Sequence, residues 1–297
     1  MLIETPAQRP SGEETATPEA AAAPQVEASS TRLTADQIYE NVRVAAEEEM
    51  DRPARALLWS AVAAGLTIGF SFLAGTYLAM LVAAPYKVAV AALGYPLGFM
   101  FVVIARNQLF TENTLEPIIP LLHHPTRETL RRLLSLWAIV FAGNMLGALA
   151  FAWMAARTPM LEIDFKRALL ETAQRATSGG FAMVAYKGIF AGWLVALMAW
   201  LVASTRATGP QILMIWLTTG PIAAFGFRHS IAGAVEAFYR AWMGAAPWGD
   251  MIFQFIVPAC LGNIIGGVVF VALLNHGQVA HGREAPQESG AIVNRFS

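Results

Sequence analysis

Six long stretches of hydrophobic residues, separated by short polar intervals, dominate the chain. A helix needs roughly 20 mostly apolar residues to cross a membrane, and each stretch approaches or exceeds that length. They cover residues 56–86, 88–105, 133–156, 181–205, 209–227 and 251–282. Only the fourth contains a charged residue, Lys187. The pattern therefore predicts an all-α membrane protein with six transmembrane helices.

Two shorter apolar pieces, residues 113–122 and 230–239, follow polar interruptions at 106–113 and 227–230. Each piece is about half as long as a membrane-spanning helix. We interpret the second and fifth transmembrane helices as broken within the membrane. In the alternative interpretation, each hydrophobic segment ends at the interruption and a short helix lies on the membrane surface.

An internal repeat favours the broken helices. The motif that begins Gly143-Asn144 recurs 119 residues later at Gly262-Asn263, and the same offset relates Thr111 to Ser230. Each half then consists of a span, a broken span and a Gly-Asn-rich span. An odd number of crossings puts the two halves in opposite orientations, as in many transporters. The sequence thus predicts two inverted three-helix repeats, although small residues also serve helix packing alone.

Composition supports a membrane protein and excludes several other classes. Charged residues make up 14% of the chain, against about 25% in an ordinary soluble domain. A single cysteine, Cys260, excludes a disulfide framework and disfavours a zinc site, so we expect no metal or cofactor. The absence of a dense basic stripe argues against nucleic acid as a partner. We expect no enzyme, because no nucleophile with an orienting partner stands at a recognisable spacing.

The net charge of −1 hides two regions of opposite sign. Residues 1–54 carry a net −7 and the remainder a net +6. The Ala/Pro-rich residues 1–32 are predicted to form a disordered acidic tail. The Thr34-x-x-Gln37 pattern begins an amphipathic helix within residues 33–54. Residues 55–276 form the predicted membrane domain, and residues 277–297 a C-terminal tail.

Ionisable groups inside the membrane are candidates for function, because burying a charge there costs roughly 2.5–3.5 kcal/mol or more. Arg106 and Glu112 flank the first interruption, where we expect them to form an ion pair. Arg228 and His229 stand at the second interruption. A half-helix that begins near Ser230 would present free N–H groups and a partial positive charge. We expect His229 to donate a hydrogen bond or a proton to an anion there, with Thr111 opposite.

These residues carry a resemblance. The run Leu109-Phe110-Thr111, the block at residues 226–231 around His229 and the paired Gly-Asn motifs resemble the formate/nitrite transporter family. The likeness extends over about residues 55–275. Residues 56–61 and 108–114, together with the acidic leader, resemble the YfdC-like branch of that family in particular.

The resemblance implies an aquaporin-like fold and a homopentamer in which each protomer has its own pore. It also implies a multi-pass protein of the inner (cytoplasmic) membrane, within the lipid bilayer, with both termini cytoplasmic. The cargo would be a small monovalent anion such as formate, nitrite, hydrosulfide, acetate or lactate, with protons as a possible second cargo. His229 matches the family's pore histidine, Thr111 its threonine partner and Leu109 a hydrophobic constriction. The pathway residues that it implies are His229, Thr111, Phe110, Leu109, Phe99, Tyr95 and Ile222.

The chain departs from the family pattern at several positions. Arg228 stands where the family often has an acid, and Gly192 where it has an asparagine. The usual lysine before the fourth span has no clear counterpart, and counting without gaps gives Ala176, next to Arg175. Arg228 and Lys187 could attract anions, or could pair with Glu112 and close the pore.

The predicted function is passive or proton-linked permeation of small monovalent anions with a central histidine. Two alternatives stay open at this point. One is a non-conducting or sensing membrane assembly, and the other is an aquaporin-like channel for neutral solutes.

Overall fold

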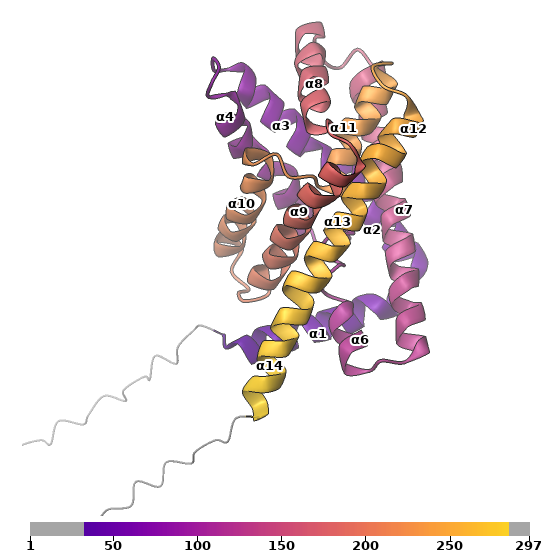
Figure 1. The fold of residues 1–297 in the computed structure, drawn as a ribbon, viewed down its shortest axis with the longest axis vertical. Helices are drawn as coiled ribbons and strands as arrows, with labels where there is room; N and C mark the ends of the chain where they lie inside the picture. Colours follow the sequence, from indigo (N-terminus) through magenta and orange to yellow (C-terminus); the bar gives the residue numbers. More distant parts are fainter. Residues whose placement is uncertain (1–32, 285–297) are drawn as a thin grey trace, which may run out of the picture. The chain divides into compact units, whose positions relative to one another are not determined.

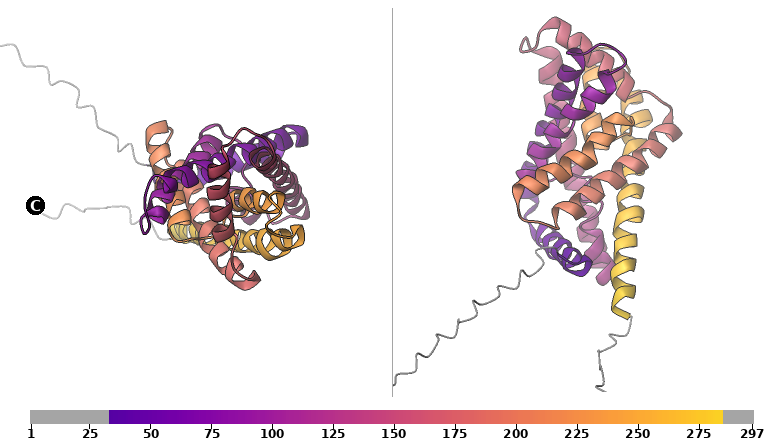
Figure 2. Two further views of the ribbon diagram at one scale, coloured as in Figure 1. Left: turned by 90° about the horizontal axis from the view of Figure 1, so that it is seen from above. Right: turned by 90° about the vertical axis from the view of Figure 1, so that its left-hand side faces the viewer.

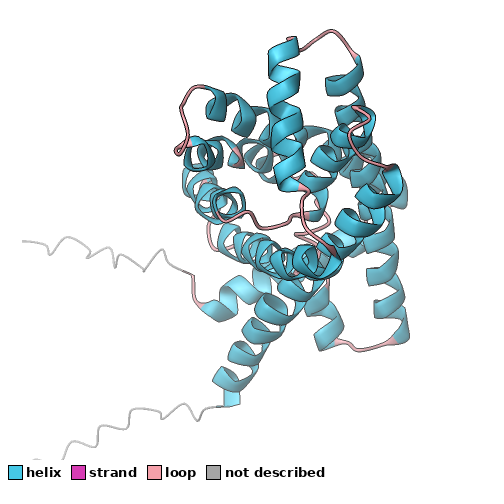
Figure 3. Ribbon diagram, turned by 45° about the horizontal axis from the view of Figure 1, so that its top comes forward, coloured by secondary structure: helices cyan, strands magenta, loops and turns pink. Residues whose placement is uncertain are grey.

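The computed structural model describes residues 33–284, and every regular element in this range is a helix (Figure 3). The predicted tail over residues 1–32, and residues 285–297 of the predicted C-terminal tail, lie outside the described residues. The all-α class is therefore confirmed for the described part of the chain.

Figure 1 shows the helices, and two π-helical segments, η1 and η2, interrupt the last long one. In chain order the elements are α1 (Ala35–Asp51), α2 (Ala54–Thr67), α3 (Gly69–Met80), α4 (Lys87–Gly94), α5 (Pro96–Ile104), α6 (Ile118–His123), α7 (Arg127–Arg157), α8 (Ile163–Ala176), α9 (Phe181–Val202), α10 (Thr208–Ala224), α11 (Ser230–Trp242), α12 (Trp248–Asp250), η1 (Met251–Ile256), α13 (Val257–Gly267), η2 (Val268–Leu273) and α14 (Leu274–Glu284). The last helix thus continues past residue 276, where we expected the membrane domain to end.

The start of α1 follows from its capping residues. The backbone N–H of Gln37 donates to Thr34 Oγ1 (3.3 Å), and the N–H of Thr34 donates to Gln37 Oε1 (2.8 Å). This reciprocal pair satisfies two of the N–H groups that a helix leaves without a partner at its N-terminus. The predicted capping box is therefore present.

Five helical segments are long and apolar enough to cross a membrane, by length and composition. They are Ala54–Met80, Lys87–Ile104, Arg127–Arg157, Phe181–Val202 and Trp248–His281. The fifth predicted stretch forms α10, which has only 17 residues before the chain leaves the helix. The fifth predicted span, and with it the total of six, therefore stays a prediction.

The backbone leaves the helical path at both polar interruptions. Regular helix is absent from the described chain between Ile104 and Ile118, and again between Ala224 and Ser230. The half-helix α11 that follows the second interruption is buried on nearly all sides. A helix buried all round belongs to a protein interior, so the alternative of a helix on the membrane surface is wrong for α11.

The two Gly-Asn motifs make corresponding contacts. α7 packs along α2, and α13 packs along α9. A Cβ atom on Gly147 would stand 2.3 Å from the carbonyl oxygen of Val62, and one on Gly266 would stand 2.1 Å from that of Ile189. Backbones can approach this closely only where a side chain is missing. The glycines thus set the spacing of one helix pair in each half.

Gly192 of α9 also permits the close approach of α9 and α13. A Cβ atom there would lie 2.2 Å from the carbonyl oxygen of Asn263. An asparagine at this position would push α9 and α13 apart. The close packing of the two helices in this chain therefore requires a glycine here.

The first and last described helices meet at one end of the bundle. The hydroxyl of Tyr39 in α1 lies 2.5 Å from Nδ1 of His276 in α14, and the Tyr39 ring also contacts the rings of His123 and Trp200. Figure 2 shows indigo α1 beside the lower end of the long yellow helix. Residues 35–51 thus form part of the packed structure.

Candidate functional site

The second break places His229 at the start of α11. Gly226 has φ 64°, in the left-handed region that favours glycine, and lets the chain turn after α10. His229 is then the N-cap of α11, and its Nδ1 accepts hydrogen bonds from the N–H groups of Ile231 (3.2 Å) and Ala232 (3.0 Å). The helix that His229 caps therefore fixes the orientation of its ring.

The other ring nitrogen joins the two breaks. His229 Nε2 lies 2.8 Å from Thr111 Oγ1, and both side chains are buried. Because Nδ1 accepts two backbone N–H groups, it carries no hydrogen, and the ring hydrogen must sit on Nε2. Nε2 then donates to the Thr111 oxygen. The structure thus brings together the pair that the repeat register indicated.

The asparagines of the Gly-Asn motifs hold both breaks in place. Asn144 accepts the N–H of Phe110 (2.9 Å) and donates to the carbonyls of Ala61 (2.8 Å) and Gln108 (2.9 Å). Asn263 accepts the N–H of Ser230 (2.8 Å) and donates to the carbonyls of Gly188 (2.8 Å) and Arg228 (2.9 Å). Phe110, rather than Thr111, thus occupies the position that corresponds to Ser230. The predicted register at the breaks is off by one residue.

The first turn of α11 has no free N–H group. Those of Ser230 and Gly233 donate to Asn263 Oδ1 (2.8 Å) and to the His229 carbonyl (2.9 Å), and the two between them donate to His229 Nδ1. Our expectation that free N–H groups here would face an anion is therefore wrong. The half-helix still contributes its dipole, but donors to a cargo must come from side chains.

Apolar side chains surround the histidine. The ring of Phe99 meets the His229 ring edge to face, with centroids 5.0 Å apart, and Tyr95 packs on Phe99. Leu109 and Ile222 are also buried. The ring of Phe110, by contrast, packs on Trp137 and Phe141 of α7.

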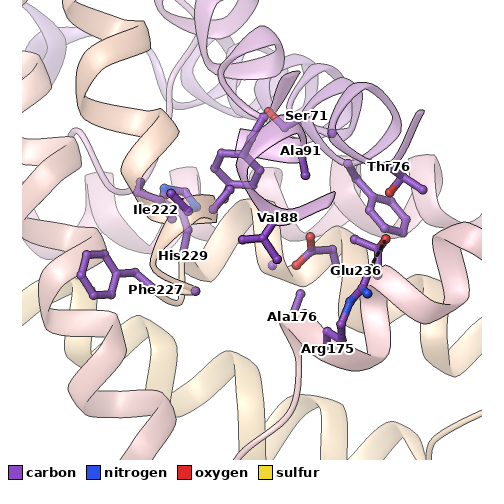
Figure 4. Close-up of a pocket in the computed structure, with 18 of the residues that line it drawn as sticks. Ser71, Thr76, Val88, Ala91, Arg175, Ala176, Ile222, Phe227, His229 and Glu236 are labelled. Carbon is purple, nitrogen blue, oxygen red and sulfur yellow. Dashed lines mark hydrogen bonds between the residues drawn. The ribbon is translucent and has the colours of Figure 1, made fainter. Parts of the chain in front are cut away.

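His229 and Ile222 are among the residues that line a cavity of about 340 Å³. The volume exceeds that of several water molecules at roughly 30 Å³ each, so a small anion would fit together with water. Figure 4 shows His229 beside Ile222, with Arg175 and Glu236 elsewhere along the cavity. The ionisable side chains that line it are Lys87, Tyr95, Arg175, Arg228, His229 and Glu236. Thr111, Leu109, Phe99 and Phe110 are not among its lining residues.

Arg228 is held by backbone carbonyls. It is 7% exposed, and its Nη2 donates to the carbonyl oxygens of Arg175 (3.2 Å) and Ser178 (3.0 Å). Its Nε has no partner among the described residues. The guanidinium thus sits at the cavity as a fixed cation.

The other charged candidates, Arg106, Glu112 and Lys187, are not among the residues that line the cavity. The backbone carbonyl of Lys187 accepts the N–H of Arg228 (3.3 Å). Arg106 has φ 54° and is exposed, whereas Glu112 is half-buried. None of the six ion pairs in the described chain involves Arg106, Glu112, Lys187 or Arg228. The expected Arg106–Glu112 pair is therefore not formed. Neither Lys187 nor Arg228 forms an ion pair with Glu112.

Sequence reasoning overlooked Glu236 and gave Arg175 little weight. Glu236 is 8% exposed and lines the cavity. Its spacing of seven residues from His229 puts both on one face of a helix, a signal present in the sequence. Arg175 lies near the end of α8 and reaches the same cavity. The described residues contain no group of three His, Cys, Asp or Glu side chains that could hold a metal ion.

Comparisons with known proteins agree on one family. A family model for formate/nitrite transporters matches residues 36–277. The chain is 36% identical over 243 residues to the inner membrane protein YfdC of Escherichia coli K12, covering 82% of this chain and 78% of that protein. It is 29% identical over 241 residues to a probable formate transporter of Methanothermobacter thermautotrophicus, covering 71% and 87%.

The fold also matches a solved structure. A pentameric formate channel with formate bound superposes with a TM-score of 0.63 at 24% identity, covering 76% of this chain and 98% of that one. At this identity the likeness concerns the fold alone.

Proposed function

The chain belongs to the formate/nitrite transporter family, and on this premise we propose that it carries small monovalent anions of weak acids across a membrane. The cargo resembles formate or nitrite, and each protomer contains its own pore. The observation that carries the proposal is that His229 lines the cavity while its Nε2 bonds to Thr111, which links the two helix breaks. Transport is passive or coupled to protons.

The assembly and its placement are parts of the same proposal. The matched structure is a pentameric formate channel, which supports a homopentamer for this chain. The name of the E. coli relative supports the inner membrane. α1 and α14 meet at one end of the bundle, which supports placing both termini on the same, cytoplasmic, side.

The geometry suggests how an anion is drawn in and passed on. Lys87, Arg175 and Arg228 line the cavity and raise the local concentration of anions. Beyond it, the rings and aliphatic groups around His229 remove water, which disfavours a charged species. The Nε2–H of His229 and the Thr111 hydroxyl are then the donors that can hold the cargo oxygen. His229 acts as a hydrogen-bond donor, because its Nδ1 is occupied by two N–H groups.

The test is uptake of formate and nitrite into liposomes that contain the purified full chain. His229→Asn keeps a side chain that caps helices well but lacks the distal ring nitrogen. Losing a hydrogen bond to a charged group costs about 1.5–3 kcal/mol, so we expect uptake to fall about 10- to 100-fold. His281→Ala is the matched control, because His281 is exposed and its Nδ1 lies 2.8 Å from the Gly277 carbonyl oxygen of its own helix.

Three outcomes would contradict the proposal. Wild-type uptake and pH dependence in His229→Asn would remove His229 from the pathway. Osmotic swelling with glycerol or water, without anion uptake, would favour a neutral-solute channel. Folded oligomers that pass no small solute would favour a sensing or otherwise non-conducting assembly.

A further inference from the structure

One face of α11 connects His229 to a second ionisable group. His229, Gly233 and Glu236 follow one another at helical spacing, and all three line the same cavity. Gly233 has no side chain to separate the other two, and a Cβ atom there would meet the ring of Phe255 at 2.6 Å. The cavity therefore runs along this helix face from the carboxyl group to the imidazole (Figure 4).

The carboxyl group of Glu236 is buried but uncommitted. Its residue is 8% exposed, and among the described residues it makes no hydrogen bond and no ion pair within 4 Å. No hydrogen bond or close ion pair with a described residue therefore has to break before this carboxyl group gives or takes a proton. The ionisable groups of the same cavity are Lys87 of α4, Tyr95 before α5, Arg175 of α8, and Arg228 and His229 before α11. The lining residues from α3 and η1, such as Thr76 and Phe255, are not ionisable.

His229 is poorly placed to exchange a proton itself. A second proton would have to go to Nδ1, which already accepts the N–H groups of Ile231 and Ala232. It would also place a positive charge at the N-terminus of α11, where the helix dipole opposes it. A proton for the cargo must therefore come from another group on the pathway.

We propose that Glu236 is the proton-transfer residue of this pathway. The inference rests on the proposed function and deepens it. Arg228 and its neighbouring cations draw the anion into the cavity, where an oxygen of the cargo takes the proton from the Glu236 carboxyl group. The neutral acid then passes His229, and the Glu236 carboxylate regains a proton from a hydronium ion that reaches the cavity from bulk water, which leaves a water molecule. One O–H bond breaks and one forms in each step, so charge and atoms balance.

The experiment compares formate with formamide, which has a similar size and shape but needs no proton. Glu236→Gln keeps the shape of the side chain and cannot donate an acid proton. We expect formate uptake at neutral pH to fall by about tenfold or more, as for loss of a general acid, while formamide permeation stays at the wild-type level. Acidifying the medium should restore formate uptake in this variant, because formic acid itself becomes available in bulk water.

Two further variants serve as a conservative replacement and as a control. Glu236→Asp retains the carboxyl group and should recover a substantial part of formate uptake. Glu171→Gln removes an exposed carboxyl group of α8 and should change nothing.

The possible failures can be told apart. Wild-type vesicles that carry neither formate nor nitrite would overturn the proposed function and this inference with it. If the wild type carries formate, equal formate uptake by Glu236→Gln would overturn the inference alone. Parallel loss of formate and formamide in Glu236→Gln would give Glu236 a structural role and would also overturn it.

Discussion

At the scale of single residues, the two buried asparagines hold the helix breaks. Asn263 satisfies the N–H of Ser230 and the carbonyls of Gly188 and Arg228. Each buried backbone group that loses its partner costs about 1–3 kcal/mol. The geometry around His229 therefore depends on a side chain that touches no cargo.

We expect Asn263→Ala to lower the free energy of unfolding by about 2–5 kcal/mol. A drop in the thermal unfolding midpoint of the purified protein in detergent would measure this loss. Asn275→Ala is the control, because Asn275 bonds only to Val271 on its own helix (2.9 Å). Equal, small shifts for both variants would show that Asn263 does not hold the break.

Some of these residue contacts could be predicted from the sequence. The approach of Thr111 to His229 followed from the repeat offset, even though the offset at the breaks is off by one residue. The role of Glu236 depended on which face of α11 turns to the cavity, and hydropathy does not determine that rotation. The carbonyl partners of Arg228 lie at Arg175 and Ser178, which are 53 and 50 residues earlier in the chain. Such contacts between distant segments leave no local sequence pattern.

At the scale of elements, hydropathy located the long helices and the two interruptions. It could not give the length of α10 or the burial of α11, because both depend on how neighbouring helices pack. The close approaches at Gly147 and Gly266 were predictable as packing sites. The sequence did not indicate that Gly192 belongs to the same α9–α13 contact, because this depends on Asn263 lying opposite it in the fold.

The packing of α1 on α6 and α14 creates a contact that depends on pH. Burial lowers the pKa of His123 below its ordinary value of 6.5, and the nearby His276 lowers it further. Protonation of His123 is therefore less favourable when α1 is packed on α6 and α14 than when α1 is detached from them. The stability that this contact gives is complete above the ordinary pKa and is lost as the pH falls below it.

We expect α1 to detach from α6 and α14 more readily below about pH 6.5 than at pH 8. Fluorescence of Trp200, whose ring lies 6.4 Å from that of Tyr39, together with limited proteolysis within α1, would follow the release. His123→Gln should flatten the pH dependence, and His281→Gln should leave it unchanged. Greater release at alkaline pH would contradict this sign.

At the scale of the whole molecule, the exposed charge at the first helix break bears on how the chains assemble. Arg106 lies at the first helix break, is exposed, and forms no ion pair within the described residues. Exposing a charge to lipid at such a depth costs roughly 2.5–3.5 kcal/mol or more. Large apolar side chains such as Trp59, Tyr186 and Phe225 are exposed as well, but lipid could cover them. We therefore expect Arg106 to have a polar partner on a neighbouring protomer of the proposed homopentamer.

We expect the purified protein in mild detergent to have a native mass of five chains of 32.0 kDa each. Arg106→Ala should shift the mass towards smaller species at a lower detergent concentration than the wild type, because groups that faced the arginine in a neighbouring protomer would lose their partner. Arg131→Ala is the matched control, since Arg131 is exposed and pairs with Glu128 on its own helix (3.1 Å). Native mass spectrometry reports both effects in one series. A monomer under all mild conditions would contradict the pentamer, whereas identical dissociation of the two variants would show that Arg106 faces lipid and not a neighbouring protomer.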